Sequence, residues 1–251
     1  AARTSARDVS HCPTVNRITN APSCRGAIFN HGRLSGFCMP HLNNVLFSGN
    51  IAESRGGAIF NFGDDNGNSS PIIINATFAH NSAPSGGAVY SSAGNNGTSS
   101  PQLSNTILWG NSAITGTQIY NLEATPTLSY TLIQRDTNAI FTVNSIITYN
   151  LHILTDNPRF VDADGADNIN GTPDDNLQLS NRSPAIDAGN NDMIHLSTDL
   201  AGNPRRYDDT GVVDAGNGIA PIIDLGVYER QNNSTPNGTG YIYLPLILNT
   251  V

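Results

Sequence analysis

The densest group of residues able to do chemistry is a set of aspartates in one glycine-containing segment, VDADGADNINGTPDD (161–175). Alternation of Asp with small residues around Gly165 places hard oxygen ligands about a tight turn. Calcium takes about six to eight oxygen ligands, and this segment offers several carboxylates. The predicted calcium ligands are Asp162, Asp164, Asp167, Asp174 and Asp175. The alternative is a solvated acidic turn whose carboxylates cap the backbone of their own loop.

Carboxylates are scarce in the preceding part of the chain. Between Arg25 and Gln134 the sequence holds only Glu53, Asp64, Asp65 and Glu123. A polysaccharide lyase or hydrolase needs several carboxylates on one face, for calcium or as a paired acid and base. Asp64 and Asp65 are adjacent, so their side chains point apart if the chain is extended there. This region predicts no catalytic site, and we interpret the protein as non-enzymatic.

Asparagines in Asn-x-Ser/Thr sequences are candidates for glycosylation, because this is the acceptor pattern for N-linked glycans. They are Asn68, Asn75, Asn96, Asn170, Asn181, Asn232, Asn233 and Asn237. Many such sequences arise by chance in a chain rich in Asn, Ser and Thr. Modification also requires a cell that glycosylates, so these positions remain candidates.

Overall composition limits the classes of partner. The net charge of -8 disfavours nucleic acid, whose phosphates require a basic surface. No uninterrupted apolar run approaches the ~20 residues of a membrane helix, so we expect no membrane span. The chain also has no lysine, which excludes a lysine Schiff base or isopeptide crosslink.

The elements that would position these residues repeat along the chain. The segment RGGAIFNFGDDNGNSSPIIINATFAHN (55–81) has partial copies on both sides, at intervals of about thirty residues. A period of this size is typical of solenoids and propellers. Each copy holds two short runs rich in Ile, Val, Phe and Tyr, ended by Gly or Asn, without helical periodicity. The sequence predicts an all-β parallel solenoid.

In such a stack each strand pairs with its equivalent ~4.8 Å away, so that like residues form files along the axis. Two inward files are expected: Ile28, Ile59, Val89 and Ile119, and Phe47, Phe78 and Leu108. An aromatic file and an asparagine ladder should accompany them: Phe29, Phe60, Tyr90 and Tyr120, and Asn50, Asn81 and Asn111. Segments 64–71 and 93–101 should project from one side, where binding is usual.

The pairing of GGAI (56–59) with FAHN (78–81) resembles the repeats of polymorphic outer-membrane proteins and of many bacterial surface proteins. Segments 157–190, 198–205 and 223–229, with SPAIDAG, TDLAGNPR and IDLGVYE, are similar to the C-terminal module of secreted β-helix proteins often labelled choice-of-anchor. The resemblance covers about residues 25–230. It implies a right-handed parallel β-helix and an extracellular or cell-surface location.

Three cysteines, Cys12, Cys24 and Cys38, all lie near the N-terminus. Clustering of this kind in a chain of exported character predicts one disulfide and one remaining thiol. Cys12 and Cys38 fall closest to stacked positions on neighbouring coils, with Cys24 as the alternative partner. Three buried, unpaired cysteines are the other interpretation.

These patterns divide the chain into an N-terminal cap (1–24), parallel coils (25–160), an acidic module closing the solenoid (161–230), a linker (231–240) and an apolar strand (241–251). The last segment is too short to cross a membrane and too apolar to remain free in water. It docks on its own solenoid or on another molecule by β-augmentation, and a residual anchoring signal is the third alternative. The docking residues are Tyr241, Ile242, Tyr243, Leu244, Leu246, Ile247 and Leu248.

We therefore interpret the protein as an extracellular structural or adhesive protein of a bacterial surface. Self-association through the C-terminal strand would make it a filament subunit, and surface glycans are a second class of partner. The predicted calcium site would fasten the acidic module to the last coils. The alternatives are a β-helix carbohydrate-active enzyme, either a lyase or a hydrolase, and a carbohydrate-binding module.

Overall fold

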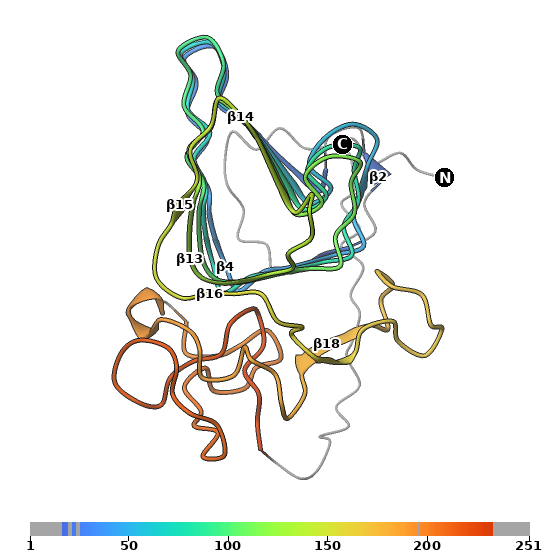
Figure 1. The fold of residues 1–251 in the computed structure, drawn as a ribbon, viewed down its shortest axis with the longest axis vertical. Coiled ribbons are helices and arrows are strands. Elements are labelled where there is room, and N and C mark those ends of the chain that lie inside the picture. The colour runs from blue at the N-terminus through green and yellow to red at the C-terminus, as the bar shows by residue number, and fades with distance from the viewer. Residues whose placement is uncertain (1–16, 20–21, 24–25, 195, 233–251) are drawn as a thin grey trace, which may run out of the picture.

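The computed structural model describes residues 17–19, 22–23, 26–194 and 196–232. Within them the chain forms a stack of coils, followed by a second unit that lies against one flank of the stack (Figure 1). The coils are built from parallel strands, and no α-helix occurs in the described ranges. The predicted all-β parallel solenoid is confirmed.

One side of the stack is a five-stranded parallel sheet in the order β14-β12-β10-β7-β3. Its strands come from successive coils: β3 (Ile28–His31), β7 (Ile59–Phe62), β10 (Val89–Ser92), β12 (Ile119–Leu122) and β14 (Ile140–Val143). Each strand pairs with its equivalent on the next coil, so Ile28, Ile59 and Val89 lie in register. Residues one sequence period apart are thus the residues that pair with each other in the sheet.

The other sides of the stack belong to a nine-stranded parallel sheet. Its strands are β1 (Arg17–Thr19), β4 (His41–Asn43), β5 (Leu46–Ser48), β8 (Ile72–Ile74), β9 (Thr77–Ala79), β11 (Gln102–Trp109), β13 (Thr127–Ile133), β15 (Thr148–Tyr149) and β16 (Ile153–Leu154). Strand β1 pairs in parallel with β5, so residues 17–19 belong to a coil one period before residues 46–48. A further short parallel pair joins β2 (Pro22–Ser23) to β6 (Ile51–Ala52).

This large sheet bends at one residue in each coil. Asn44, Asn75, Asn105 and Tyr130 occupy the bend with φ values of 61°, 51°, 53° and 46°. Asparagine adopts this left-handed conformation more easily than most residues, because its short side chain can hydrogen-bond locally. The coil therefore turns a corner here, which divides the sheet into two faces (Figure 1).

Predicted files of side chains fill the interior. The rings of Phe47 and Phe78 stack with centroids 4.7 Å apart, and Leu108 lies in register with Phe78. All three side chains are fully buried, as is the neighbouring Ile59. The opposite file, Ile28, Ile59, Val89 and Ile119, is also in register and buried. Both inward files are confirmed.

The aromatic file and the asparagine ladder are confirmed as well. Phe29, Phe60, Tyr90 and Tyr120 follow one another with ring centroids 5.1, 5.1 and 4.7 Å apart. In the ladder, Nδ2 of Asn50 donates to Oδ1 of Asn81 at 2.8 Å, and Nδ2 of Asn81 donates to Oδ1 of Asn111 at 2.9 Å. Because these buried amides bond to each other, the turn leaves few polar groups without partners.

The C-terminal unit, residues 157–232, is mostly turns and is called the flank module below. It begins with an antiparallel pair, β17 (Phe160–Asp162) with β18 (Asn176–Leu179), and contains the 3-10 helix η1 (Asn191–Met193). None of the described residues belongs to a helix with the length and hydrophobicity that a membrane span requires.

We expected the flank module to close the solenoid. It lies instead beside the stack, along the face formed by β5, β9, β11 and β13 (Figure 1). Leu46 and Val227 belong to one cluster of buried apolar side chains, and Ile107 and Leu225 belong to another. This face of the coils is apolar on the outside, so it would present a hydrophobic strip to water without the module. Covering that strip explains the lateral position.

Candidate functional site

Residues 226–227 of DLGVYE form the contact at which the flank module docks on the coils. The N–H of Val227 donates to Oγ1 of Thr77 at 3.1 Å, and the N–H of Gly226 donates to the carbonyl of Asn105 at 2.9 Å. Gly226 has a φ of 87°, and a Cβ there would lie 2.7 Å from Oγ1 of Thr77 and 2.8 Å from Cδ1 of Ile107. Glycine is therefore required by both its backbone conformation and the close approach.

A second contact continues the corner asparagines of the coils into the flank module. Nδ2 of Asn105 donates to Oδ1 of Asn75 at 3.0 Å and to the carbonyl of Asn190 at 3.1 Å, while Oδ1 of Asn105 accepts from the N–H of Asn190 at 2.8 Å. Asn44, one coil further, donates to the carbonyl of Thr198 at 3.2 Å. The same residue type thus turns the coil and holds the module.

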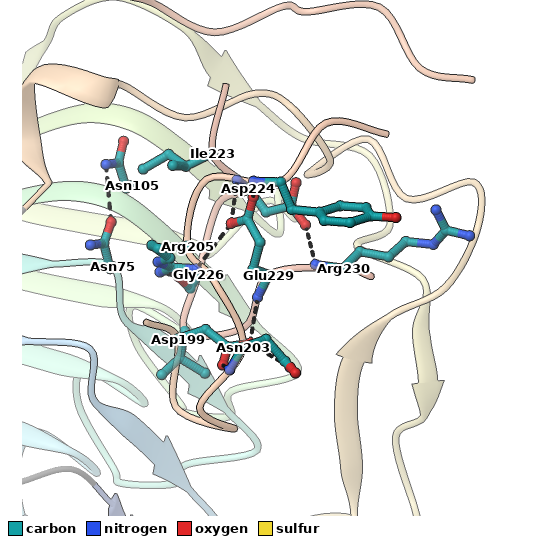
Figure 2. Close-up of polar contacts among 12 residues, drawn as sticks. Asn75, Asn105, Asp199, Asn203, Arg205, Ile223, Asp224, Gly226, Glu229 and Arg230 are labelled. Carbon is teal, nitrogen blue, oxygen red and sulfur yellow. Dashed lines mark hydrogen bonds and ion pairs between the residues drawn. The ribbon is translucent and has the colours of Figure 1, made fainter. Parts of the chain in front are cut away.

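Arg205 bonds to the docked segment from within the flank module (Figure 2). Its side chain is 1% exposed, its Nη2 donates to the carbonyl of Gly226, and its Nη1 lies 3.5 Å from Oε2 of Glu229. A buried guanidinium is costly unless it is paired, and removal of one partner leaves a buried charge behind. Arg205 therefore fixes the turn that presents Gly226 to the coils.

Three carboxylates complete this buried network. Oδ2 of Asp199 accepts from the N–H of Glu229 at 3.0 Å, Oδ2 of Asp224 accepts from the N–H of Arg230 at 2.6 Å, and Oε2 of Glu229 accepts from the N–H of Asp224 at 3.0 Å. Burial raises the pKa of Asp224 and of Glu229 above their usual values. Each of the three carboxylates is bonded to backbone, which suits a role in ordering the turns.

The acidic loop predicted to bind calcium has its own internal bonds. Oδ2 of Asp174 accepts from the N–H groups of Ala166 and Asp167 at 2.8 and 3.2 Å, and Oδ2 of Asp175 accepts from Gly171 at 2.7 Å. Oδ1 of Asp167 accepts from the N–H of Ile169 at 2.8 Å. Asp162 is exposed and Asp164 is half-buried. These bonds are those of an acidic turn whose carboxylates cap the backbone of their own loop, which was the alternative to a calcium site. Calcium binding by this loop stays a prediction.

Other predicted sites are placed only in part. Cys38 is buried with its Sγ 3.6 Å from Oδ1 of Asn30, whereas Cys12 and Cys24 lie outside the described residues, so the disulfide stays a prediction. The docking residues of 241–251 and the sequons Asn233 and Asn237 also fall outside. Asn96, Asn170, Asn181 and Asn232 are exposed, and Asn68 is half-buried.

Asn75 is a wrong candidate for glycosylation. Its side chain is fully buried, and its amide donates to Asn43 and accepts from Asn105 inside the corner of the coils. A glycan on this nitrogen would have to occupy the interior. The sequon pattern does not distinguish such a buried asparagine from an exposed one.

Projecting loops form a second candidate surface, the stacked turns, defined as residues 33–36, 64–67 and 94–97. The N–H groups of Gly36, Gly67 and Gly97 donate to the carbonyls of Arg33, Asp64 and Gly94 at 3.1, 3.1 and 3.2 Å. The central pairs all have positive φ: Leu34 and Ser35 (56° and 61°), Asp65 and Asn66 (56° and 59°), Asn95 and Asn96 (55° and 61°). Positive φ at both central positions is the type I′ pattern. Loops 64–71 and 93–101 project as predicted, and the first loop joins them (Figure 1).

The first of the stacked turns breaks the sequence rule that the other two follow. Asp and Asn suit the left-handed conformation, whereas a leucine there costs about 1–2 kcal/mol. Leu34 is 70% exposed, and the nearby Phe37 and Met39 are 73% and 50% exposed. Strained backbone that carries exposed apolar side chains is characteristic of functional surfaces. In the sequence this difference reads as LS at 34–35, in place of DN at 65–66 and NN at 95–96.

Comparison with known protein families matches a short stretch of the coils to a repeat model. Residues 44–61 match the model of the Chlamydia polymorphic membrane protein (Chlamydia_PMP) repeat. This stretch begins at the corner residue Asn44, includes Asn50 of the asparagine ladder, and ends within β7. No curated protein and no solved structure gave a significant match. The repeat and the parallel sheets together support a surface protein similar to the polymorphic membrane proteins.

Proposed function

We propose that the chain is a non-enzymatic adhesive protein of the bacterial cell surface, and that the stacked turns contact its target. The match to the surface-protein repeat supports the location. The observation that carries the contact site is the exposed, strained first turn at Leu34, with Phe37 beside it. A leucine in this position strains the backbone of the coil, and such strain clusters at functional sites, which supports a role in contacting the target.

Rigid positioning makes the stacked turns suitable for adhesion. The N–H of Ser35 donates to the carbonyl of Asp65 at 3.1 Å, and the N–H of Asn66 donates to the carbonyl of Asn95 at 3.0 Å. Each turn is thereby fixed by the next, which reduces the entropy lost when a target binds. Phe37 offers an apolar ring beside Asn, Asp and Ser groups, a combination that suits the apolar faces and hydroxyls of surface glycans.

The test is adhesion of beads coated with the full chain to cells and to immobilised surface glycans. Leu34→Asn combined with Phe37→Ser should reduce bead retention at least about tenfold, since an exposed hot-spot side chain contributes about 2 kcal/mol or more. The matched control is Ile114→Ser, because Ile114 is 83% exposed on another turn of the same coils. Equal retention by all three proteins would contradict the proposal.

Self-association through residues 241–251 is a further part of the proposed function. These residues lie outside the described ranges, and the argument is their apolar strand-forming sequence, YIYLPLILNTV. Deleting residues 236–251 should convert oligomers or fibres to monomers in light scattering and electron microscopy. A truncated protein that assembles as before would show that this segment is not the connector.

A further inference from the structure

Three aspartates from separated parts of the flank module meet at one point. Asp187, Asp208 and Asp214 each place a carboxylate oxygen within 4.8 Å of the other two. Two oxygens bound to one calcium ion at about 2.3–2.6 Å lie no more than about 5 Å apart. The spacing therefore matches a shared calcium ion. Calcium also accepts an irregular set of oxygen ligands, whereas magnesium demands a near-ideal octahedron with bonds of about 2.0–2.1 Å.

The side chain of Asp187 points to a ligand independently of this clustering. It is 0% exposed, and neither of its carboxylate oxygens has a hydrogen-bond partner among the described residues. A buried carboxylate without donors is strongly unfavourable, and most buried polar atoms in proteins are paired. Asp224 and Glu229, which are also buried, both accept backbone N–H groups. Asp187 is instead directed at Asp208 and Asp214, which supply no hydrogen when ionised.

Main-chain bonds hold the three residues in place. The N–H of Asp187 donates to Oδ1 of Asp224 at 2.8 Å, and the carbonyl of Asp187 accepts from Ala215 and Gly216, both at 2.9 Å. The last two bonds fix the backbone directly after Asp214. Asp187 itself has a φ of 50°, a conformation that Asp tolerates.

The nearest arginine is already engaged. Arg230 pairs with Asp209, the residue next to Asp208, and its Nη1 also bonds to Asn232. Asp208 is therefore left to face Asp187 while its neighbour is neutralised. The cluster carries three carboxylates, and the positive charge beside it is shared with a fourth.

We propose that Asp187, Asp208 and Asp214 bind one calcium ion, which ties the segment containing SPAIDAG to the loop at 207–217. Asp187 supplies a ligand from the interior, and the exposed Asp208 and Asp214 leave room for water to complete about six to eight oxygen ligands. This site is separate from the predicted calcium loop at 162–175. The sequence offered no local motif for it, because its ligands are 21 and 6 residues apart.

Electrostatics agrees with the geometry. The pKa of Asp187 is raised to about 7, first by burial and then by the carboxylates of Asp214 and Asp208, while Arg230 acts in the opposite direction. Asp224 is a further acidic group whose field reaches Asp187. A divalent cation would offset this repulsion and the lost hydration.

The test is titration calorimetry with calcium chloride on the full chain after exhaustive chelation. The parent should show a calcium site whose affinity is at least about tenfold weaker in Asp187→Asn and in Asp214→Asn, since even outer-shell changes weaken metal sites by about 10–100-fold. Asp156→Asn is the matched control, because it removes one exposed negative charge elsewhere, and Asp164→Asn tests the predicted loop. Both variants should keep the site at Asp187 with the affinity of the parent.

Each contrary result overturns the inference. It fails if the parent binds no calcium, if Asp187→Asn and Asp214→Asn bind like the parent, or if Asp164→Asn abolishes the site. Asp214 is exposed, so its variant keeps the test valid if Asp187→Asn does not fold. Melting curves give a second readout: calcium should raise the melting temperature of the parent and of Asp156→Asn, but not of Asp214→Asn.

Discussion

The coils and the flank module are stabilised in opposite ways. In the coils the same contact recurs at each level: Phe47 on Phe78, Ile59 on Val89, Asn50 on Asn81. In the flank module the contacts occur once and involve charge, as with Arg205 and Glu229 or the unpartnered carboxylate of Asp187. Repetition gives a stack whose stability is a sum over neighbouring coils. The module depends on a few single contacts, so its stability should respond to pH and ions where that of the coils does not.

The largest effect should come from the repeated interior. Phe78→Ala removes a ring that is fully buried and stacked on Phe47, and we expect a loss of about 3–5 kcal/mol in the free energy of unfolding. Urea denaturation measures it, with Ile114→Ala as the exposed control. A loss under about 1 kcal/mol would mean that the file is not a close-packed core.

Replacing Asp187 by asparagine should give the next largest change in stability. Whether the variant is more or less stable than the parent should depend on pH and on calcium. The folded pKa of Asp187, about 7, lies above the ordinary value of 3.8, so in chelator its contribution to stability is present below pH 4 and is lost as pH rises through 7. Asp208, Asp214, Asp224 and Arg230 are the charged groups facing it. Asp187→Asn should therefore be more stable than the parent at pH 8 in chelator, by roughly 2–3 kcal/mol, and about equal at pH 4.

With calcium at pH 8 the parent should instead be more stable than Asp187→Asn, because only the parent can bind the ion at this site. Thermal unfolding at both pH values, with chelator and with calcium, checks the four combinations. If the stability difference between the two proteins is the same at pH 4 and pH 8 in chelator, then Asp187 is not the strained acid described above.

Gly226 tests whether the module can be loosened without unfolding the coils. A Cβ at this position would meet Thr77 and Ile107 at 2.7–2.8 Å, and the φ of 87° disfavours any other residue. Gly226→Ala should cost about 1–3 kcal/mol, the usual range for overpacking. Hydrogen exchange should show loss of protection in residues 185–229 while β7, β10 and β12 stay protected. Uniform loss in both regions would show that the two unfold as one unit.

The smallest effect is expected at the stacked turns, and it should be stabilising. Leu34→Asn places a residue suited to positive φ where the coil has a leucine at 56°, and should add about 0.5–1 kcal/mol to the free energy of unfolding. The same change in an exposed position with ordinary φ, Leu196→Asn, is the control. If adhesion falls while stability rises, the leucine is retained for function; a loss of stability would contradict that view.

Sequence alone predicted the coils well because their contacts are periodic. Residues one period apart pair with each other, so the interval of about thirty residues between the copies already predicted the register of the sheets and the identity of the buried files. The projecting loops followed from the same alignment. The projecting turn at Leu34, the first of the stacked turns, could not be predicted in this way, because its residues do not have the Asn and Asp composition of the other two.

Tertiary structure alone decided where the flank module lies and which of its side chains meet. Val227 bonds to Thr77 across 150 residues, and Asp187, Asp208 and Asp214 come together from three separated positions. It also decided that Asn75 is buried and that Asp174 bonds within its own loop. Each of these contacts occurs only once, so no repeated pattern in the sequence predicts it. Composition and period determine a stack of coils, whereas single contacts between distant segments depend on how the whole chain packs.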